Sequence, residues 1–221
     1  MSFALFHNRS EAGRFLAARL GHFANHPDVV VLALPRGGVP VGFEVAKALH
    51  APMDVFVVRK LGVPGHEELA MGAIASGGAR VLNQHVVETL GIPESLIEMV
   101  AEKEQGELER QEREYRDERL PIDVTARKIV LVDDGLATGS SMRVALAALE
   151  KKRPERIVVA VPVAAVATCV EFESEVDQLV CGVTPDPFWA VGQWYADFSP
   201  TTDDEVRHLL RQASALAPKV A

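Results

Sequence analysis

The chain has 221 residues with 31 acidic and 23 basic side chains, a formal net charge of −8 and a pI near 5.4. Its length suits one full core with a small accessory piece, and its 48% apolar content and mean hydropathy of +0.09 exclude a disordered chain. The acidic balance excludes a broad surface for nucleic acid or anionic membranes, because both need a basic face.

The first predicted strand is the β-branched run from 28 to 34, which enters the turn Pro35-Arg36-Gly37-Gly38. Pro40 suits the first turn of a helix that follows over 41–49. A second strand is predicted over 53–59 and a weaker third over 69–76. Between them, the glycines and proline of Lys60 to Glu68 indicate a mobile loop.

A helical segment is predicted between Pro93 and Pro121. Within it, residues 98–119 hold nine acidic and five basic side chains in 22 positions. This pattern favours a solvated helix with i, i+4 pairs such as Glu109/Arg113 and Glu112/Arg116. A helix that binds a partner is the alternative.

The second half alternates strands and helices. Strands are predicted over 128–132, 157–161 and 178–181, and helices over 141–152 and 164–172. Apolar strands in this order predict a parallel sheet covered by helices on both faces.

The last segment, from 184 to 204, is rich in aromatic residues and should form a small irregular lobe before a final helix over 203–216. It contains five of the thirteen Phe, Trp and Tyr residues, namely Phe188, Trp189, Trp194, Tyr195 and Phe198.

Cysteine usage and the termini exclude further classes. Cys169 and Cys181 form no CxxC motif and have no histidines at metal-ligand spacing, so neither a disulfide scaffold nor a zinc site is expected. Residues 1–8 lack the pattern of a signal peptide, and no apolar run approaches the ~20 residues that span a bilayer. We therefore expect a cytoplasmic protein that does not act on membranes or nucleic acids.

The most informative stretch follows the strand at 128–132. Asp133 and Asp134 stand where open α/β sheets bind ligands, and a loop of small residues leads from them into a helix. Such a loop can turn its amide N–H groups toward a phosphate, while the carboxylates can accept bonds from vicinal sugar hydroxyls. The pattern indicates a ribose 5-phosphate pocket, the alternative being an ordinary strand-end turn with a helix cap. The candidate phosphate-binding residues are Gly135, Leu136, Ala137, Thr138, Gly139, Ser140 and Ser141.

The stretch Val132-Asp-Asp-Gly-Leu-Ala-Thr-Gly-Ser-Ser-Met142 resembles the phosphoribosyl diphosphate signature of the type I phosphoribosyltransferases. The resemblance implies a central, mostly parallel five-stranded sheet with helices on both faces, a small hood and a helical insertion at about 84–121. It places the core in residues 1–183 and the hood with the final helix in 184–221. It also implies that Asp133 and Asp134 hold the ribose hydroxyls and that the following loop holds the 5′-phosphate.

Two further elements fit the same family. Arg36, Gly37 and Gly38 follow the first strand, where the family has a diphosphate-binding loop that often contains a strained peptide bond. The glycines allow close backbone approach, and an arginine fork can bind the diphosphate oxygens. Arg59 and Lys60 open the predicted loop, which in the family closes over the reacting centre. They are candidates for neutralising the leaving group, with His66 as a weaker one.

Departures from the family pattern bear on the substrate. Ala137 stands where 6-oxopurine transferases commonly carry an Asp, so the loop resembles the adenine and orotate types more closely. Ser140-Ser141 replaces the usual Gly-Thr but keeps hydroxyl donors. Aromatic side chains of the hood could stack on a planar base or could form the core of their own lobe. The stacking candidates are Phe188, Trp189, Trp194 and Tyr195.

The resemblance implies Mg²⁺-dependent transfer of the phosphoribosyl group from 5-phosphoribosyl 1-diphosphate (PRPP) to a nitrogenous base, or the reverse reaction. The metal would be held mainly through PRPP, with Asp133 and Asp134 as further candidate ligands. A regulatory protein that binds PRPP or a nucleotide without turnover is the alternative, and an amine acceptor is a third possibility. Relatives often dimerise, so a homodimer is an open expectation.

Overall fold

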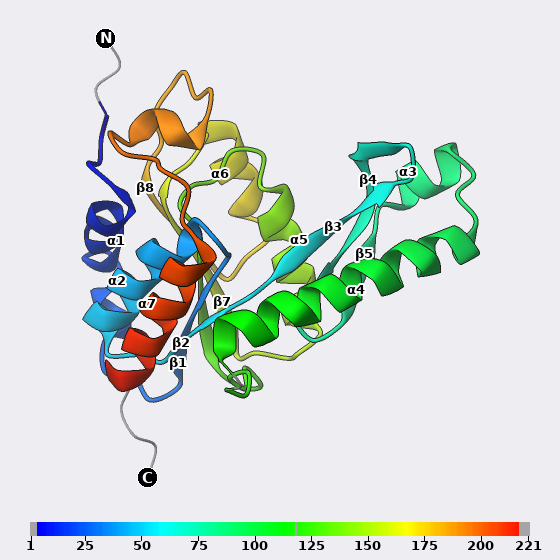
Figure 1. Ribbon diagram of the computed structural model, residues 1–221. Coiled ribbons are helices and arrows are strands. Elements are labelled where there is room, and N and C mark those ends of the chain that lie inside the picture. The colour runs from blue at the N-terminus through cyan, green and yellow to red at the C-terminus, as the bar shows by residue number, and fades with distance from the viewer. Residues whose placement is uncertain (1–3, 118, 217–221) are drawn as a thin grey trace.

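The computed structural model describes residues 4–117 and 119–216, and its centre is a five-stranded, fully parallel sheet (Figure 1). The strand order is β2-β1-β6-β7-β8, which confirms the predicted α/β architecture. The strands are β1 (Val29–Ala33), β2 (Met53–Val55), β6 (Lys128–Val132), β7 (Arg156–Val163) and β8 (Gln178–Val183).

Helices cover both faces of this sheet, because the strands are apolar on both sides. Alternate residues of β1 pack into two cores, with Val31 in one and Leu32 in the other. The first core contains α1 (Arg9–Ala17), α2 (Gly38–Leu49) and α7 (Asp203–Leu216), while the second contains α5 (Ser140–Glu150) and α6 (Val166–Phe172).

A second, antiparallel sheet and two helices form a segment that projects from the central sheet, which we call the arm (Figure 1). The arm consists of β3 (Val58–Val63), β4 (His66–Ala75), β5 (Ala79–Leu82), α3 (Gln84–Thr89) and α4 (Glu94–Arg116). The strand predicted over 53–59 is therefore two strands, which divide at Phe56-Val57 between the two sheets. The inserted structure also begins earlier in the chain than the expected helical insertion.

The prediction of a mobile loop over Lys60 to Glu68 is wrong. Strands β3 and β4 pair as a hairpin, and only Pro64 and Gly65 lie between them. Gly65 has a φ of +79°, which a turn after proline favours. The register shifts at Gly62, so this glycine marks a bulge inside a strand rather than a flexible connection.

Helix α4 is only partly the solvated helix that its charges suggest. One face is buried and contributes Ile97, Leu108 and Tyr115 to the core. The expected Glu112/Arg116 pair is present at 3.0 Å, but Arg116 is itself buried and binds both carboxylate oxygens of Asp54 at 3.0 Å. This ion pair ties the end of α4 to β2.

The remaining features are short 3₁₀ turns at η1 (Gly21–Phe23) and η2 (Val191–Trp194) and one covalent link. Cys169 of α6 and Cys181 of β8 form a disulfide, which the cysteine spacing did not indicate. Within the described ranges, none of the helices combines the length and apolar character needed to cross a bilayer.

Candidate functional site

The acid pair lies at the carboxyl end of β6, where parallel sheets place their ligands. Asp133 Oδ1 accepts the backbone N–H of Asp134 at 2.8 Å. Burial raises the pKa of Asp133 well above its usual range, and the neighbouring charge of Asp134 adds to the effect. Burial also raises the pKa of Asp134, against the opposing influence of the Arg9 guanidinium. The site therefore concentrates two carboxyl groups whose ionisation is costly without a partner.

The loop after the acids presents backbone donors. Gly139 has a φ of +72° and directly precedes α5, so the loop turns there into the helix N-terminus. The amide N–H groups from Thr138 to Ser141 find no acceptor among the residues that the structure describes. The Thr138 and Ser140 hydroxyls lie 3.1 Å apart and are exposed. Such unpartnered amides at a helix N-terminus favour an anion.

Side chains of α5 and α6 fix the shape of this loop. Thr168 Oγ1 donates to the Ala137 carbonyl at 2.5 Å, and Arg143 Nη1 donates to the Thr138 carbonyl at 3.0 Å. Arg143 is itself paired with Glu171 and Glu175. The Ala137 and Thr138 carbonyls are thus bound by side chains of the two helices.

The glycines after β1 allow a second loop to approach the acid pair. A Cβ on Gly38 would lie 2.8 Å from the Val132 carbonyl oxygen, and one on Gly37 would lie 2.8 Å from the carboxyl carbon of Asp134. The peptide bond between Pro35 and Arg36 is cis. A side chain at Gly38 would collide with the backbone of β6, and one at Gly37 would displace the Asp134 carboxylate, so the structure brings this loop and the acids together.

The arginines expected to bind diphosphate already have carboxylate partners. Arg36 Nη1 lies 3.7 Å from Asp203 Oδ1 on α7, in a half-exposed pair. Arg59 lies on β3, and its Nη2 is 2.7 Å from Glu104 Oε2 on α4. Lys60 and His66 are exposed on β3 and β4. Arg36 lies in the loop after β1 as expected, whereas Arg59, Lys60 and His66 lie on the strands of a hairpin instead of in the expected mobile loop. Both arginines would have to exchange partners to bind an anion.

Asp203 also connects α7 to the arm. The Tyr115 hydroxyl of α4 donates to Asp203 Oδ1 at 2.6 Å. Burial, together with this bond, raises the pKa of Tyr115 to about 12, so the hydroxyl stays a donor throughout the physiological range. One carboxylate thus faces both Arg36 and α4.

The aromatic residues of the C-terminal lobe have different surroundings. Tyr195 is buried with Phe6, and its hydroxyl donates to the Asp134 backbone carbonyl at 2.5 Å. Phe188 and Trp194 are half-buried with ring centroids 6.2 Å apart, while Trp189 is 80% exposed. Tyr195 is therefore built into the lobe's own core, and Trp189 is the stacking candidate with the most exposed ring.

Sequence reasoning missed Arg9, which contacts the acid pair directly. Its Nε donates to Asp134 Oδ2 at 2.8 Å, from 125 positions earlier in the chain. No motif surrounds Arg9. The only local signal is Asn8, which caps α1 by accepting the Glu11 N–H, and that signal concerns the helix rather than a ligand.

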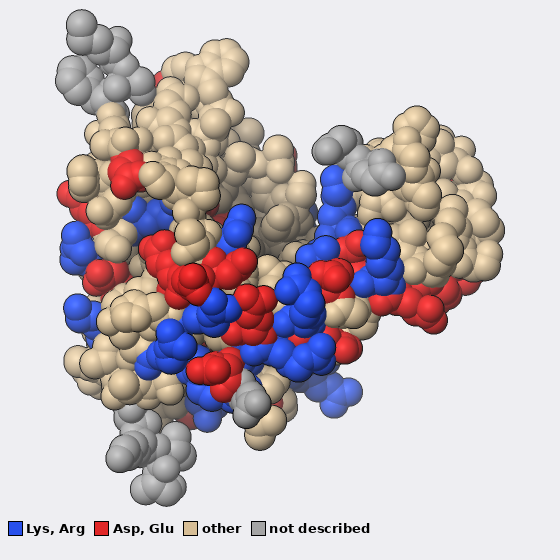
Figure 2. All heavy atoms as spheres, viewed as in Figure 1, with Lys and Arg blue, Asp and Glu red and all other residues tan. Residues whose placement is uncertain are grey.

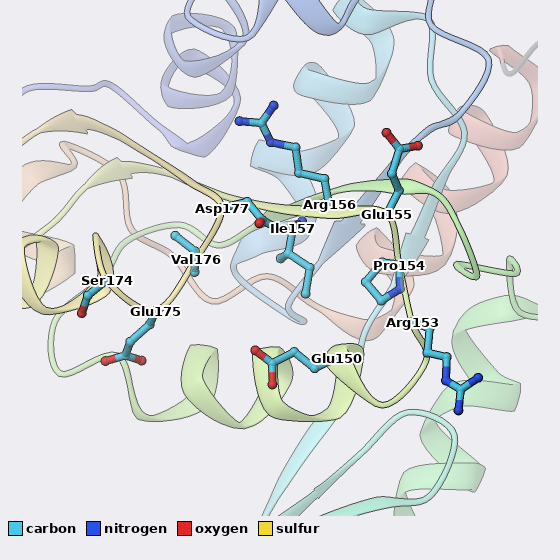
Figure 3. A pocket seen from close by; sticks show the side chains of 10 residues that line it. All are labelled: Glu150, Arg153, Pro154, Glu155, Arg156, Ile157, Ser174, Glu175, Val176 and Asp177. Carbon is cyan, nitrogen blue, oxygen red and sulfur yellow. Dashed lines mark hydrogen bonds between the residues drawn. The ribbon is translucent and has the colours of Figure 1, made fainter.

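Hollows elsewhere do not belong to this site. A hollow of about 480 Å³ (Figure 3) lies at the amino ends of β7 and β8. The acids follow the carboxyl end of β6, at the opposite end of the sheet. Asp177, at its edge, accepts the Ile157 N–H at 2.8 Å and so caps the start of β7. On the face formed by α4 and α7, acidic and basic side chains are intermixed, with no uniformly basic area in that view (Figure 2). The hollow at the amino ends therefore lies away from the acid pair.

Metal binding by the protein alone finds little support in this arrangement. Within residues 4–117 and 119–216, no group of three or more His, Cys, Asp or Glu side chains is placed to hold a metal ion. Two adjacent carboxylates do fit a cation such as Mg²⁺ that takes most of its ligands from substrate phosphates and water.

The chain is similar to several known proteins. Two proteins from the CDC 1551 and H37Rv strains of Mycobacterium tuberculosis, each named "Putative phosphoribosyl transferase", are 46% identical over 209 residues. The match covers 95% of this chain but 47% of each relative, so the chain spans about half their length. The crystal structure of TT1426 from Thermus thermophilus has a TM-score of 0.82 and 38% identity, covering 96% of this chain and 99% of that one.

The family model of the phosphoribosyl transferase domain matches residues 5–195. That range includes the acid pair, the amide loop and the glycine loop after β1. The chain belongs to the phosphoribosyl transferase domain family.

Proposed function

We propose that this protein transfers the 5-phosphoribosyl group from PRPP to the ring nitrogen of a base, releasing diphosphate. One stretch of chain carries the proposal: two carboxylates are followed, at the start of α5, by amides that have no acceptor among the residues described by the structure. A ligand that offers hydroxyl donors next to a phosphate would satisfy both. Ribose 5-phosphate has this pattern.

Asp133 and Asp134 would accept bonds from the ribose hydroxyls, while the amides from Thr138 to Ser141 would bind the 5′-phosphate. Fixing the sugar at both ends leaves its C1 carbon in a defined position. Positioning of this kind lowers the barrier to displacement by removing translational and rotational freedom beforehand. No nucleophilic side chain is needed.

The diphosphate leaving group would lie against the loop of Arg36, Gly37 and Gly38. Gly37 and Gly38 let the backbone approach closely, and Arg36 could exchange Asp203 for diphosphate oxygens because its present pair is half-exposed. Arg59 and Lys60 would assist from the arm. These cations would neutralise charge that grows on the leaving group.

Mg²⁺, when bound with PRPP, would supply further neutralisation of the diphosphate charge. In this chain Asp133 and Asp134, which would also accept bonds from the ribose hydroxyls, are the candidate protein ligands for an ion held mainly through PRPP. The carboxylates must be ionised to bind it, which their raised pKa values oppose in the absence of a cation.

The direct test is incubation with PRPP, Mg²⁺ and a panel of purine bases, pyrimidine bases and simple amines, with diphosphate release as the readout. We expect release with one class of acceptor and none with the Asp133→Asn, Asp134→Asn double variant. Background release with every acceptor, although PRPP still binds, would contradict the transferase proposal.

A PRPP or nucleotide sensor is the second candidate, and one observation favours it. Both arginines expected at the leaving group are already paired, Arg36 with Asp203 and Arg59 with Glu104. A binding protein needs the phosphate loop but no cations free for a leaving group. Binding of PRPP without turnover would support this candidate.

A further inference from the structure

Arg9, the first residue of α1, connects the ribose end of the site to the C-terminal lobe. Its Nε donates to Asp134 Oδ2 at 2.8 Å, and its Nη1 donates to the Ser199 carbonyl at 2.8 Å. The side chains of Arg9 and Asp134 are only 11% and 14% exposed. Breaking such a pair leaves a charge largely removed from water, so the geometry is strongly held.

Aromatic rings fix the guanidinium from the side. Its central carbon lies 3.9 Å from the centroid of the Phe198 ring and 6.0 Å from that of Tyr195. Tyr195 in turn donates to the Asp134 carbonyl at 2.5 Å. The lobe therefore holds Asp134 twice, once through its backbone and once through Arg9.

Backbone hydrogen bonds between an N-terminal and a C-terminal segment hold the chain next to Arg9. The Phe6 N–H donates to the Trp194 carbonyl at 3.0 Å, and the Ala196 N–H donates to the Phe6 carbonyl at 2.8 Å. The Asp197 N–H continues this pairing to the His7 carbonyl. Segments 5–7 and 194–197 are thus hydrogen-bonded to each other through their backbones, which fixes the start of α1.

The diphosphate loop packs against the same pair. A Cβ on Gly37 would lie 3.3 Å from Arg9 Nε and 2.1 Å from Asp134 Oδ2. The ion pair is therefore enclosed by the glycine loop on one side and by the aromatic lobe on the other.

We propose that Arg9 is a positioning residue for sugar recognition, holding Asp134 by one oxygen so that the other can accept a bond from a ribose hydroxyl. The inference rests on the proposed function, because it needs a ribose ligand at the acid pair. Arg9 acts through Asp134 and makes recognition of the sugar depend on the lobe at 194–199. Within the described part of the chain, Arg9 makes no hydrogen bond to the amide loop that would bind phosphate.

This separation of sugar from phosphate provides the test. We would measure binding of ribose 5-phosphate and of inorganic phosphate by calorimetry to the unchanged chain and to the Arg9→Met, Arg9→Lys and Arg14→Met variants. Arg14 is the matched control, because it lies on the same helix but is 60% exposed and pairs with Glu44. The melting temperature of each variant is recorded alongside.

We expect Arg9→Met to weaken ribose 5-phosphate about tenfold, the effect of losing one charge-assisted bond, while phosphate binding is unchanged. Arg9→Lys should recover part of the loss, and Arg14→Met should show none. In an Asp134→Asn background, Arg9→Met should have little further effect, since both changes remove the same oriented carboxylate. Phe198→Leu keeps both charges and should give a smaller loss of ribose 5-phosphate affinity. This variant replaces Arg9→Met in the test if Arg9→Met folds poorly.

Equal binding of ribose 5-phosphate by Arg9→Met and Arg14→Met would overturn the inference and leave the proposed function standing. A parallel loss of both ligands would also overturn it, because it would show a general structural role. If the unchanged chain binds phosphate but not ribose 5-phosphate, the proposed function fails, and the inference fails with it.

Discussion

The two ends of the proposed PRPP site differ in how ready they are for a ligand. At the 5′-phosphate end, the amides of the loop before α5 have no partner within the described chain, and Thr168 and Arg143 already fix the loop from behind. At the diphosphate end, Arg36 and Arg59 are bound to Asp203 and Glu104. If PRPP binds as proposed, the comparison predicts that the first end would bind it without rearrangement, whereas the second would have to exchange ion pairs.

The acid pair lies between the two ends and should produce the largest effect. Replacing both Asp133 and Asp134 by Asn removes the charged acceptors for the sugar hydroxyls but keeps the shape of the side chains. Because charge-assisted bonds are worth about 1.5–3 kcal/mol each, we expect PRPP affinity to fall by about 100-fold or more. Calorimetry measures the loss, and circular dichroism checks that the variant folds. Unchanged affinity would refute the assignment of the site.

The 5′-phosphate end, where the loop is already fixed, can be tested at Gly139. Ala at this position would place a Cβ 2.4 Å from the Phe172 ring at a φ of +72°, so the loop must shift. We expect phosphate and PRPP to bind about tenfold more weakly, as the amides leave their common direction. Gly106→Ala is the control, because the added Cβ meets nothing within 4 Å and the helix tolerates alanine. Normal phosphate binding by Gly139→Ala would show that the loop is not a fixed cradle.

The same comparison explains what could be predicted from the sequence. The 5′-phosphate end is one continuous stretch, in which a strand, two acids, a small-residue loop and a helix follow in order, so pattern alone indicated it. The glycines after β1 were recognisable for the same reason. Arg9 was not, because its contact with Asp134 spans 125 positions and depends on how segments 5–7 and 194–197 pair.

The arm shows why the second end was harder to predict. Glycine and proline between 60 and 68 have the composition of a loop, yet Leu61 and Val63 are buried in a hairpin, and a bulge accommodates Gly62. Only pairing with β4 decides between the two structures. Arg36 and Arg59 are paired with Asp203 of α7 and Glu104 of α4. No pattern in the sequence of these helices indicates that the two carboxylates contact the arginines.

Asp133 should lower the stability of the ligand-free protein as the pH rises. Its pKa is raised in the folded chain, mainly by burial, so ionisation favours the unfolded chain and stability falls as the pH rises through the folded pKa. Asp133→Asn removes this cost. Without ligand or Mg²⁺, we expect the variant to melt a few degrees higher than the unchanged chain at pH 8, and the two to converge near pH 4. A variant that melts lower at pH 8 would contradict the assigned direction of the shift.

Ion-pair exchange at the diphosphate end should give the smallest effect. Asp203→Asn keeps an acceptor for the Tyr115 hydroxyl but removes the charge that holds Arg36, so Arg36 becomes available to the ligand. A half-exposed pair is worth about 0–1 kcal/mol, so diphosphate and PRPP should bind about two- to fivefold more tightly, with ribose 5-phosphate unchanged. Asp204→Asn is the matched control, since Asp204 is exposed and pairs with Arg207 instead. Weaker diphosphate binding by Asp203→Asn would mean that Asp203 orients Arg36 for the ligand rather than competing with it, and the two ends of the site would then both be prepared in advance.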